Sequence, residues 1–417
     1  MANAATLAPL SLRDQITVFT VSLAHGATHW LHMVPTVLML LVKKEFGLDY
    51  TDVGLFGTVY YAAGFVTNLV SGPLTDLMGR RERFQIVALL ILCVSMVVMS
   101  LATGFWTFTL AAALITVGNS LWHPAAIPYL ATRYDDRRGY VLSIHSVCSS
   151  FADFLAPTVI GGMISGWFFI QFTWRETALI NVWPVVVALP FVFYLIVRDN
   201  GSATFREKDG MDVKSYIDGM IVQLKNKAVI GLAIMAGLRS TAQGSIRLFF
   251  PFYVAEILNV PPAQAAGMAG LALTAMNLGG TLAAVPAGMA SDKYGRRPLT
   301  MWALGISTIA IVALTFLQDE ISLVIGICIV GFSIYALRPV MLSWMMDIVP
   351  SELRGSGTNL MFTTQTLLQV ASPLIAGLLA DKYGLVSVFY LAAGILLLAN
   401  AVAFMLPKDE VSARAAR

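Results

Sequence analysis

The decapeptide GPLTDLMGRR at residues 72–81 has a counterpart, GMASDKYGRR, at residues 288–297, which is 216 positions later. Four further landmarks recur at the same offset, and five landmarks at one spacing argue against coincidence. The chain is therefore predicted to consist of two copies of one unit. The other landmark pairs are Pro35 and Pro251, Arg138-Gly139 and Arg354-Gly355, Pro157 and Pro373, and Gly161 and Gly377.

The composition predicts that both copies lie in a membrane. The 417 residues are 57% hydrophobic and only 12% charged, whereas an ordinary soluble domain is about 25% charged. About 20 mostly apolar residues suffice to cross a bilayer, and such runs recur throughout. We predict an all-α polytopic membrane protein with an N-terminal six-helix half (1–198), a polar cytoplasmic linker (199–227) and a C-terminal half (228–417). The twelve predicted spans are 15–42, 51–78, 84–103, 106–132, 139–168, 177–197, 228–257, 263–290, 298–317, 321–348, 356–380 and 386–406.

Basic residues predict the orientation. With both termini inside, cytoplasmic segments hold twenty of the 27 Lys and Arg residues and outer loops hold four. Because basic residues concentrate in cytoplasmic loops, we expect both termini in the cytoplasm and the chain in the inner (plasma) membrane. The net charge of +3 reflects this bias and gives no reason to expect a nucleic-acid partner. The first eleven residues carry no charged region, so we expect no cleaved signal peptide.

The repeated decapeptide also carries a family resemblance. Gly-x-x-x-Asp-x-x-Gly-Arg-Arg, between helices two and three and again between eight and nine, resembles the loop signature of the major facilitator superfamily. The resemblance covers nearly the whole chain. Two stretches, SLWHPAAIPYLATRYDDRRGYVLSIH (120–145) and FLAPTVIGG (154–162), resemble the fosmidomycin-resistance-like group within it. Drug/proton antiporters of the superfamily carry a buried arginine where this chain has His123-Pro124, so their coupling mechanism is not transferred.

The signature predicts a gate. Its glycines allow tight turns and close helix contacts, and its aspartates lie at cytoplasmic helix ends within reach of the paired arginines. We expect this cluster to latch the two halves in the outward-open state and to release them in the inward-open state. The predicted gating residues are Gly72, Asp76, Gly79, Arg80, Arg81, Gly288, Asp292, Gly295, Arg296 and Arg297.

Ionisable side chains inside the spans predict the kind of substrate. Each costs at least about 2.5–3.5 kcal/mol at mid-bilayer, so each marks a functional hypothesis. Three bases, Arg239, Arg247 and Arg338, face one clear acid, Asp153. The excess of positive charge, and the planar fork of arginine, suit the oxygen atoms of a small organic anion or zwitterion.

Polar stripes predict where that substrate binds. In AHGATHWLH (24–32), three histidines share one helix face, and Arg239, Gln243 and Arg247 form a matching stripe on the repeat-mate helix. In the family that the chain resembles, helices 1, 4, 7 and 10 line the central cavity, which implies that His123 and Arg338 also face it. The predicted substrate-binding residues are His25, His29, His32, His123, Arg239, Gln243, Arg247 and Arg338.

The fifth span predicts a proton-coupling site. His145, Ser149 and Asp153 form a polar stripe, and glutamines occupy two equivalent positions of the other half. A buried carboxylate beside histidines, which titrate near physiological pH, can carry a proton across. We therefore assign proton coupling to Asp153 and His145. A structural ion pair between Asp153 and Arg239 stays open as an alternative.

The histidine stripe leaves other interpretations open. His25 and His29 have a spacing that suits two metal ligands, but His32 lies almost two turns away from His25 and the nearby arginines would repel a cation. We therefore expect no bound metal and no cofactor. The histidines could also be packing groups that bond to neighbouring helices.

Taken together, these patterns predict a monomeric secondary transporter. It would export a small organic anion by alternating access, coupled to proton entry as an antiporter. The alternatives are a metal or metal-chelate carrier that uses His25, His29 and His32, a proton-driven importer of carboxylates, and a transporter-like sensor. No nucleotide-binding Gly-rich loop is present, and no nucleophile with its base indicates an enzyme.

Overall fold

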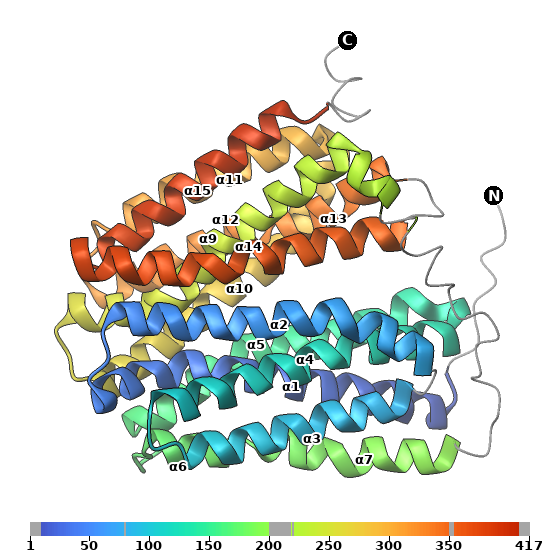
Figure 1. The fold of residues 1–417 in the computed structure, drawn as a ribbon, viewed down its shortest axis with the longest axis horizontal. Coiled ribbons are helices and arrows are strands. Elements are labelled where there is room, and N and C mark those ends of the chain that lie inside the picture. Colours follow the sequence, from blue (N-terminus) through green and yellow to red (C-terminus); the bar gives the residue numbers. More distant parts are fainter. Residues whose placement is uncertain (1–9, 79–80, 200–217, 219–220, 350–353, 408–417) are drawn as a thin grey trace.

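The computed structural model describes residues 10–78, 81–199, 218, 221–349 and 354–407. Most of the predicted linker lies outside these ranges. The first half packs its helices side by side across the molecule (Figure 1), with a short 3₁₀ turn (Asp135–Arg137) before the fifth crossing. Its helices are α1 (Leu12–Phe46), α2 (Tyr50–Met78), α3 (Arg81–Ser100), α4 (Phe105–Arg133), α5 (Arg138–Ser165), α6 (Trp174–Ile180) and α7 (Trp183–Asp199).

The second half repeats this arrangement. In each half one crossing is made of two shorter helices: α6 and α7 form the sixth, and α12 and α13 form the tenth. The described helices thus match the twelve predicted spans. The helices of the second half are α9 (Lys227–Leu258), α10 (Pro262–Tyr294), α11 (Arg296–Leu314), α12 (Glu320–Tyr335), α13 (Leu337–Ile348), α14 (Arg354–Tyr383) and α15 (Val386–Met405).

Two of the crossings, α1 and α9, differ from the rest in polarity. Ten described segments are long and apolar enough to span a membrane by themselves, and these two are not among them. They carry the histidine stripe and the arginine stripe, and both are buried along most of their length. Because polar groups facing lipid are costly, other helices must cover α1 and α9. The two helices that carry the polar stripes are therefore central.

Two predicted helices are broken in the structure, and a proline accounts for each break. The predicted span 177–197 is interrupted between α6 and α7, and 321–348 is interrupted between α12 and α13. Pro184 and Pro339 lack the N–H that would bond to the carbonyls of Ile180 and Tyr335, which are the last residues of α6 and α12. The second break places Arg338 in the first turn of α13.

The two halves contact each other closely at two pairs of helices. A Cβ atom on Gly377 of α14 would lie 2.2 Å from the carbonyl oxygen of Tyr50 in α2, and one on Gly161 of α5 would lie 2.3 Å from that of Ala266 in α10. Only glycine permits such backbone approach. The glycine pair that recurs at the 216-residue offset therefore marks two close contacts between the halves.

A hydrogen-bonded cap joins the halves at the same end of the molecule. The carboxylate of Asp381 in α14 accepts bonds from the backbone N–H groups of Tyr50 and Thr51, at 2.9 and 2.7 Å, and from the Thr51 hydroxyl at 2.6 Å. The first N–H groups of a helix have no partner within the helix, so a side chain of one half caps a helix of the other. The first turn of α1 and the last turn of α15 lie at the opposite end of the molecule (Figure 1).

Candidate functional site

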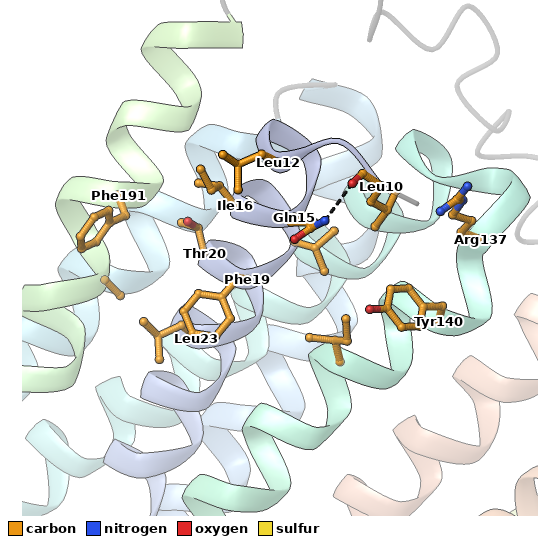
Figure 2. A pocket seen from close by; sticks show the side chains of 13 residues that line it. Leu10, Leu12, Gln15, Ile16, Phe19, Thr20, Leu23, Arg137, Tyr140 and Phe191 are labelled. Carbon is orange, nitrogen blue, oxygen red and sulfur yellow. Dashed lines mark hydrogen bonds between the residues drawn. The ribbon is translucent and has the colours of Figure 1, made fainter. Parts of the chain in front are cut away.

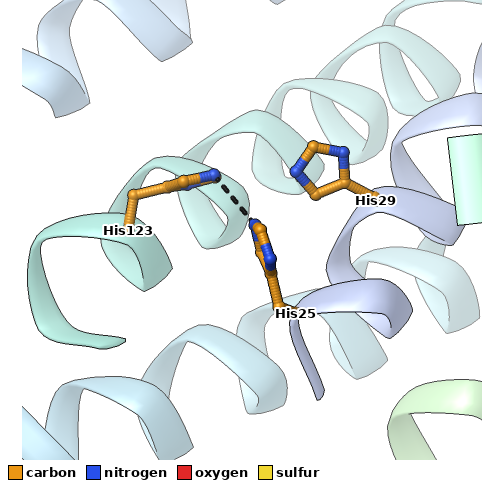
Figure 3. Close-up of side chains that lie close together, drawn as sticks. All are labelled: His25, His29 and His123. Atoms are coloured by element: carbon orange, nitrogen blue, oxygen red, sulfur yellow. Dashed lines mark hydrogen bonds between the residues drawn. The ribbon is translucent and has the colours of Figure 1, made fainter. Parts of the chain in front are cut away.

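Three histidine rings from α1 and α4 converge on one point (Figure 3). His25 and His29 project from the same face of α1, one turn apart, and His123 approaches them from α4. Nitrogen atoms of the three rings lie within 4.8 Å of one another. His25 is buried, while His29 and His123 are partly exposed. The structure therefore brings together two histidines of the predicted stripe with the histidine of the His123-Pro124 step.

Backbone carbonyls fix two of these rings. His25 Nδ1 lies 2.9 Å from the carbonyl oxygen of His145, and His123 Nδ1 lies 2.8 Å from that of Asn119. A carbonyl only accepts hydrogen bonds, so both Nδ1 atoms must be the protonated donors. The Nε2 atoms of these neutral rings then carry lone pairs, and they face each other at 3.3 Å.

The third ring, that of His29, is held by the carboxylate of Asp153. His29 Nδ1 lies 3.0 and 3.1 Å from the two carboxylate oxygens of Asp153 in α5, and its Nε2 is buried with no hydrogen-bond partner among the described residues. Asn277 of α10, in the other half, donates to the carbonyl oxygen of Asp153 at 2.7 Å. The pair of His29 and Asp153 therefore lies at the interface between the halves.

His145 contacts this group through its ring face. It stacks on His25 with 3.8 Å between ring centroids and is 2% exposed. In the described part of the chain neither of its ring nitrogens has a hydrogen-bond partner. The predicted stripe on α5 exists, but the carboxylate of Asp153 bonds to His29 and not to His145.

His32 belongs to a different group. Its Nδ1 lies 2.7 Å from the hydroxyl of Tyr60 in α2, and it is not part of the converging set. Tyr60 packs edge-on against Tyr61, with 5.7 Å between centroids, and Tyr61 accepts a bond from Arg247 at 3.3 Å. This tyrosine pair thus links the histidine stripe to the arginine stripe of the other half.

Arg239 is held entirely by its own half. Its guanidinium donates to Gln243 at 2.9 Å, to the hydroxyl of Ser240 at 2.9 Å and to the carbonyl oxygen of Ile334 at 3.1 Å. The side chain is 4% exposed. None of these partners is Asp153, so in this conformation the alternative of a bridge between Arg239 and Asp153 is not formed.

Arg338 is the exposed member of the arginine set. It lies in the first turn of α13, immediately after the break that follows Tyr335, and its side chain is exposed. Within the described ranges no hydrogen bond or ion pair holds it. Pro339 follows it, so an Arg-Pro step stands in the second half at nearly the position of His123-Pro124 in the first.

Several contact residues could not be recognised from the sequence. Tyr60 and Tyr61 form an aromatic pair on α2 that resembles ordinary packing residues, and Asn277 is one polar residue on a long apolar helix. The carbonyl of Asn119 belongs to the backbone and gives no signal at all. Only the polarity of Asn277 within a span could have indicated a role.

The described gating residues make contacts within their own half. Arg296 binds Asp292 at 2.5 Å and Asp347 at 3.1 Å, and Arg297 donates to the backbone carbonyls of Ala403 and Phe404. Gly295 has a φ of 97°, which favours glycine. Arg81 begins α3, and open space surrounds the Cα atoms of Gly72 and Gly288. Gly79, Arg80 and the side chain of Asp76 lie outside the described residues.

An apolar groove lies on the surface of the first half, away from the predicted site residues (Figure 2). It encloses about 810 Å³ between α1, α5 and α7. Phe19 and Phe191 line it and are 59% and 53% exposed. Exposed aromatic side chains on a membrane helix are typical of contact with lipid, and none of the predicted site residues lines this groove.

Twelve crossings in two matching halves, with ionisable side chains buried where the halves meet, define a membrane transporter. The model of the Major Facilitator Superfamily matches residues 18–269 and 232–417. The chain belongs to this superfamily.

The curated relatives are distant in sequence. The chain is 22% identical over 376 residues to the multidrug resistance protein MdtG of Escherichia coli O6:K15:H31, and the match covers 89% of this chain and 88% of that protein. It is 24% identical over 196 residues to the MFS-type transporter YwoD of Bacillus subtilis, which covers 47% of this chain and 39% of YwoD. The resemblance to the fosmidomycin-resistance-like group stays a prediction.

Solved structures share the fold. A bacterial homologue of the human lysosomal transporter Spinster, in an inward-facing and occupied conformation, has a TM-score of 0.74 at 15% identity; the match covers 95% of this chain and 97% of that one. A mutant of the nucleoside transporter NupG has a TM-score of 0.75 at 12% identity, over 95% and 100% of the two chains.

Proposed function

We propose that the protein is a monomeric, proton-coupled exporter of a small organic anion or zwitterion that works by alternating access. The proposal rests on the position and exposure of Arg338. It is a cation in the middle of a membrane crossing, its side chain is exposed, and no acid of the described chain pairs with it. Because an arginine facing lipid is costly, this side chain must face water between the halves.

A second guanidinium lies beside the same helix break. Arg239 donates to the carbonyl oxygen of Ile334, four residues before Arg338. The break therefore has a fixed arginine on one side and an exposed arginine on the other. Two guanidinium groups so placed suit a carboxylate, phosphate or phosphonate, whose oxygen atoms can accept paired hydrogen bonds. Arg247, half-buried and bonded to Tyr61, would extend this positive region towards the first half.

Export is supported by comparison. MdtG is named a multidrug resistance protein, and the sequence resembles the fosmidomycin-resistance-like group, which implies a phosphonate substrate. Resistance agrees with outward transport, and a phosphonate agrees with a positive site. The basic loops predict that both termini lie in the cytoplasm, so the tight contacts between the halves, which lie at the opposite end, would close the outer face. This conformation would then be inward-open, the state in which the predicted cytoplasmic latch is released.

Proton coupling is supported by the pair of His29 and Asp153. Its components come from α1 and α5, and Asn277 ties the same aspartate to α10 of the other half. Protonation of the carboxylate would weaken its bond to His29, at the residue whose backbone carbonyl bonds to the other half. A proton bound here can therefore favour one conformation over the other.

Arg338→Gln tests the anion site. Purified protein is screened by thermal shift against phosphonates, carboxylates, sugars and amines, since a ligand that binds the folded state raises its stability. We expect the best anion to lose its stabilising effect in Arg338→Gln, and Arg338→Lys to restore it only in part, because the bidentate geometry is lost.

The matched control is Arg83→Gln, which removes the same charge from an exposed position on α3, outside every predicted site. It should leave the ligand response unchanged. Normal anion binding by Arg338→Gln, or an equal loss in Arg83→Gln, would contradict the proposed site.

A further inference from the structure

We propose that His25, His29 and His123 bind one divalent transition-metal ion through their Nε2 atoms, with water or an anionic ligand completing the coordination. The three rings meet where α1 contacts α4, and their nitrogen atoms lie within 4.8 Å of one another. This site is distinct from the arginines of the proposed anion site, and either assignment could fail without the other.

The lone pairs give the first argument. Each Nδ1 has an acceptor: the carbonyls of His145 and Asn119 for His25 and His123, and the carboxylate of Asp153 for His29. Each Nδ1 therefore donates, and each Nε2 of a neutral ring presents a lone pair. Lone pairs that converge without a cation repel one another. One proton could bridge His25 and His123, but it would leave the buried Nε2 of His29 without a partner among the described residues. A metal ion can satisfy all three.

The distances give the second argument. Zinc–histidine bonds are about 2.0–2.1 Å long, so two Nε2 atoms on a tetrahedral ion lie about 3.3–3.4 Å apart. The Nε2 atoms of His25 and His123 are 3.3 Å apart. The three rings are mutually edge-on or steeply inclined, with interplanar angles of 85°, 85° and 65°. The three ligand nitrogens lie within 4.8 Å of one another, so the His29 ring must move towards the other two to complete the set.

The supporting residues give the third argument. Histidines that bind metal usually donate their other N–H to a carbonyl or carboxylate, which fixes the ring and raises its basicity. All three rings have such an acceptor, and for His29 it is the only clear mid-span acid of the chain. The negative charge of Asp153 also offsets part of the charge of the ion. Arg239, one of the three arginines within the spans, is held by partners of its own half.

The structure changes the ligand set that the sequence indicated. Spacing along α1 supplied His25 and His29 and left His32 too far away, which argued against a metal together with the repulsion expected from the arginines. The third ligand instead comes from α4, and His32 bonds to Tyr60. Three imidazoles without a thiolate suit zinc, copper, nickel or iron. Zinc is the probe of choice because it adopts tetrahedral coordination and has no redox chemistry.

The test uses full-length, tag-free protein in detergent, stripped of metal and titrated with Zn²⁺ by calorimetry. Co²⁺ is titrated in parallel, because its absorption reports tetrahedral coordination, and X-ray absorption counts the imidazoles. We expect one zinc per chain with three imidazole ligands. His25→Gln, His29→Gln and His123→Gln should each weaken binding at least tenfold, and Asp153→Asn should weaken it roughly 10–100-fold.

His32→Gln is the matched control, since it removes a histidine from the same helix but not from the converging set, and it should retain wild-type zinc affinity. The proposal is overturned if the wild type binds no zinc at 100 µM, a concentration of the order that weak adventitious sites require. It is also overturned if each of the three single variants binds zinc as tightly as the wild type. If a variant unfolds, the imidazole count on the wild type decides: fewer than three imidazoles would reject the site.

Discussion

At the scale of single residues, Asp153 serves two helices at once. Its carboxylate holds His29 of α1, and its backbone carbonyl accepts a bond from Asn277 of α10. In the proposed cycle this carboxylate takes up a proton from outside and releases it inside. Asp153→Asn cannot do so, because an amide stays neutral. We expect proton-driven net flux in proteoliposomes to fall to the level of protein-free vesicles, while substrate counterflow persists.

Ser149→Ala, one turn earlier on α5, is the control and should leave both activities intact. Net flux that still follows the pH gradient in Asp153→Asn would assign coupling to the histidines. If counterflow is lost together with net flux, the pair of His29 and Asp153 has a structural role.

The candidate site could be predicted only in part for reasons that these residues illustrate. Helical periodicity places His25 and His29 on one face because that relation is local. Periodicity says nothing about which residue of α4 meets them, so His123 entered the site by family resemblance alone. His32 lies on the same face but forms a hydrogen bond with the hydroxyl of Tyr60, and no sequence pattern predicts that bond.

At the scale of helices, the close contact of α2 with α14 depends on Gly377. A methyl group there would lie 2.2 Å from the carbonyl oxygen of Tyr50, so the backbones must separate. We expect Gly377→Ala to destabilise this conformation by about 1–3 kcal/mol, the usual cost of overpacking. Thermal unfolding in detergent measures the loss, and thiol labelling at the end distant from the termini measures the opening.

Gly394→Ala is the matched control, because nothing lies within 4 Å of its Cβ position on α15. It should be neutral or stabilising by up to about 1 kcal/mol, since alanine favours helix over glycine. Equal effects of the two substitutions would show that the contact does not limit the approach of the halves.

Helix existence was predictable and helix continuity was not. Hydropathy records the length of an apolar run, and all twelve runs correspond to helices. It does not register the loss of one backbone hydrogen bond at Pro184 or Pro339. Proline alone is no guide either, because α1 runs unbroken through Pro35 and α5 through Pro157.

At the scale of the whole molecule, the internal repeat predicted two halves, and the structure shows which ends of them meet. The end at which the halves meet differs between the conformations of a transporter. One sequence encodes all of these conformations, so it does not predict which end is closed in this structure. The Asp381 cap on α2 is one contact that distinguishes them, because it joins one half to the other.

Asp381→Ala should therefore shift the population away from this conformation. Loss of a helix cap costs about 0.5–2 kcal/mol, and one to two kcal/mol changes a two-state ratio roughly 5–30-fold. Distances between spin labels on the loops before α2 and after α14 should lengthen. Asp319→Ala, which removes a cap from α12 within one half, should lower stability without moving the labels. Unchanged distances in Asp381→Ala would mean that other contacts hold this end closed.

Hydrogen exchange at the cap on α2 can also report on the transport cycle. Two backbone amides, those of Tyr50 and Thr51, are protected by an oxygen pair that belongs to the opposite half. Each time the halves part at this end, both protons become free to exchange with solvent deuterium, and each closure protects them again. The exchange rate at the first turn of α2 then reports how readily this end opens. Substrate, proton gradient or metal would each reveal its influence on the cycle as faster or slower isotope uptake at a single peptide.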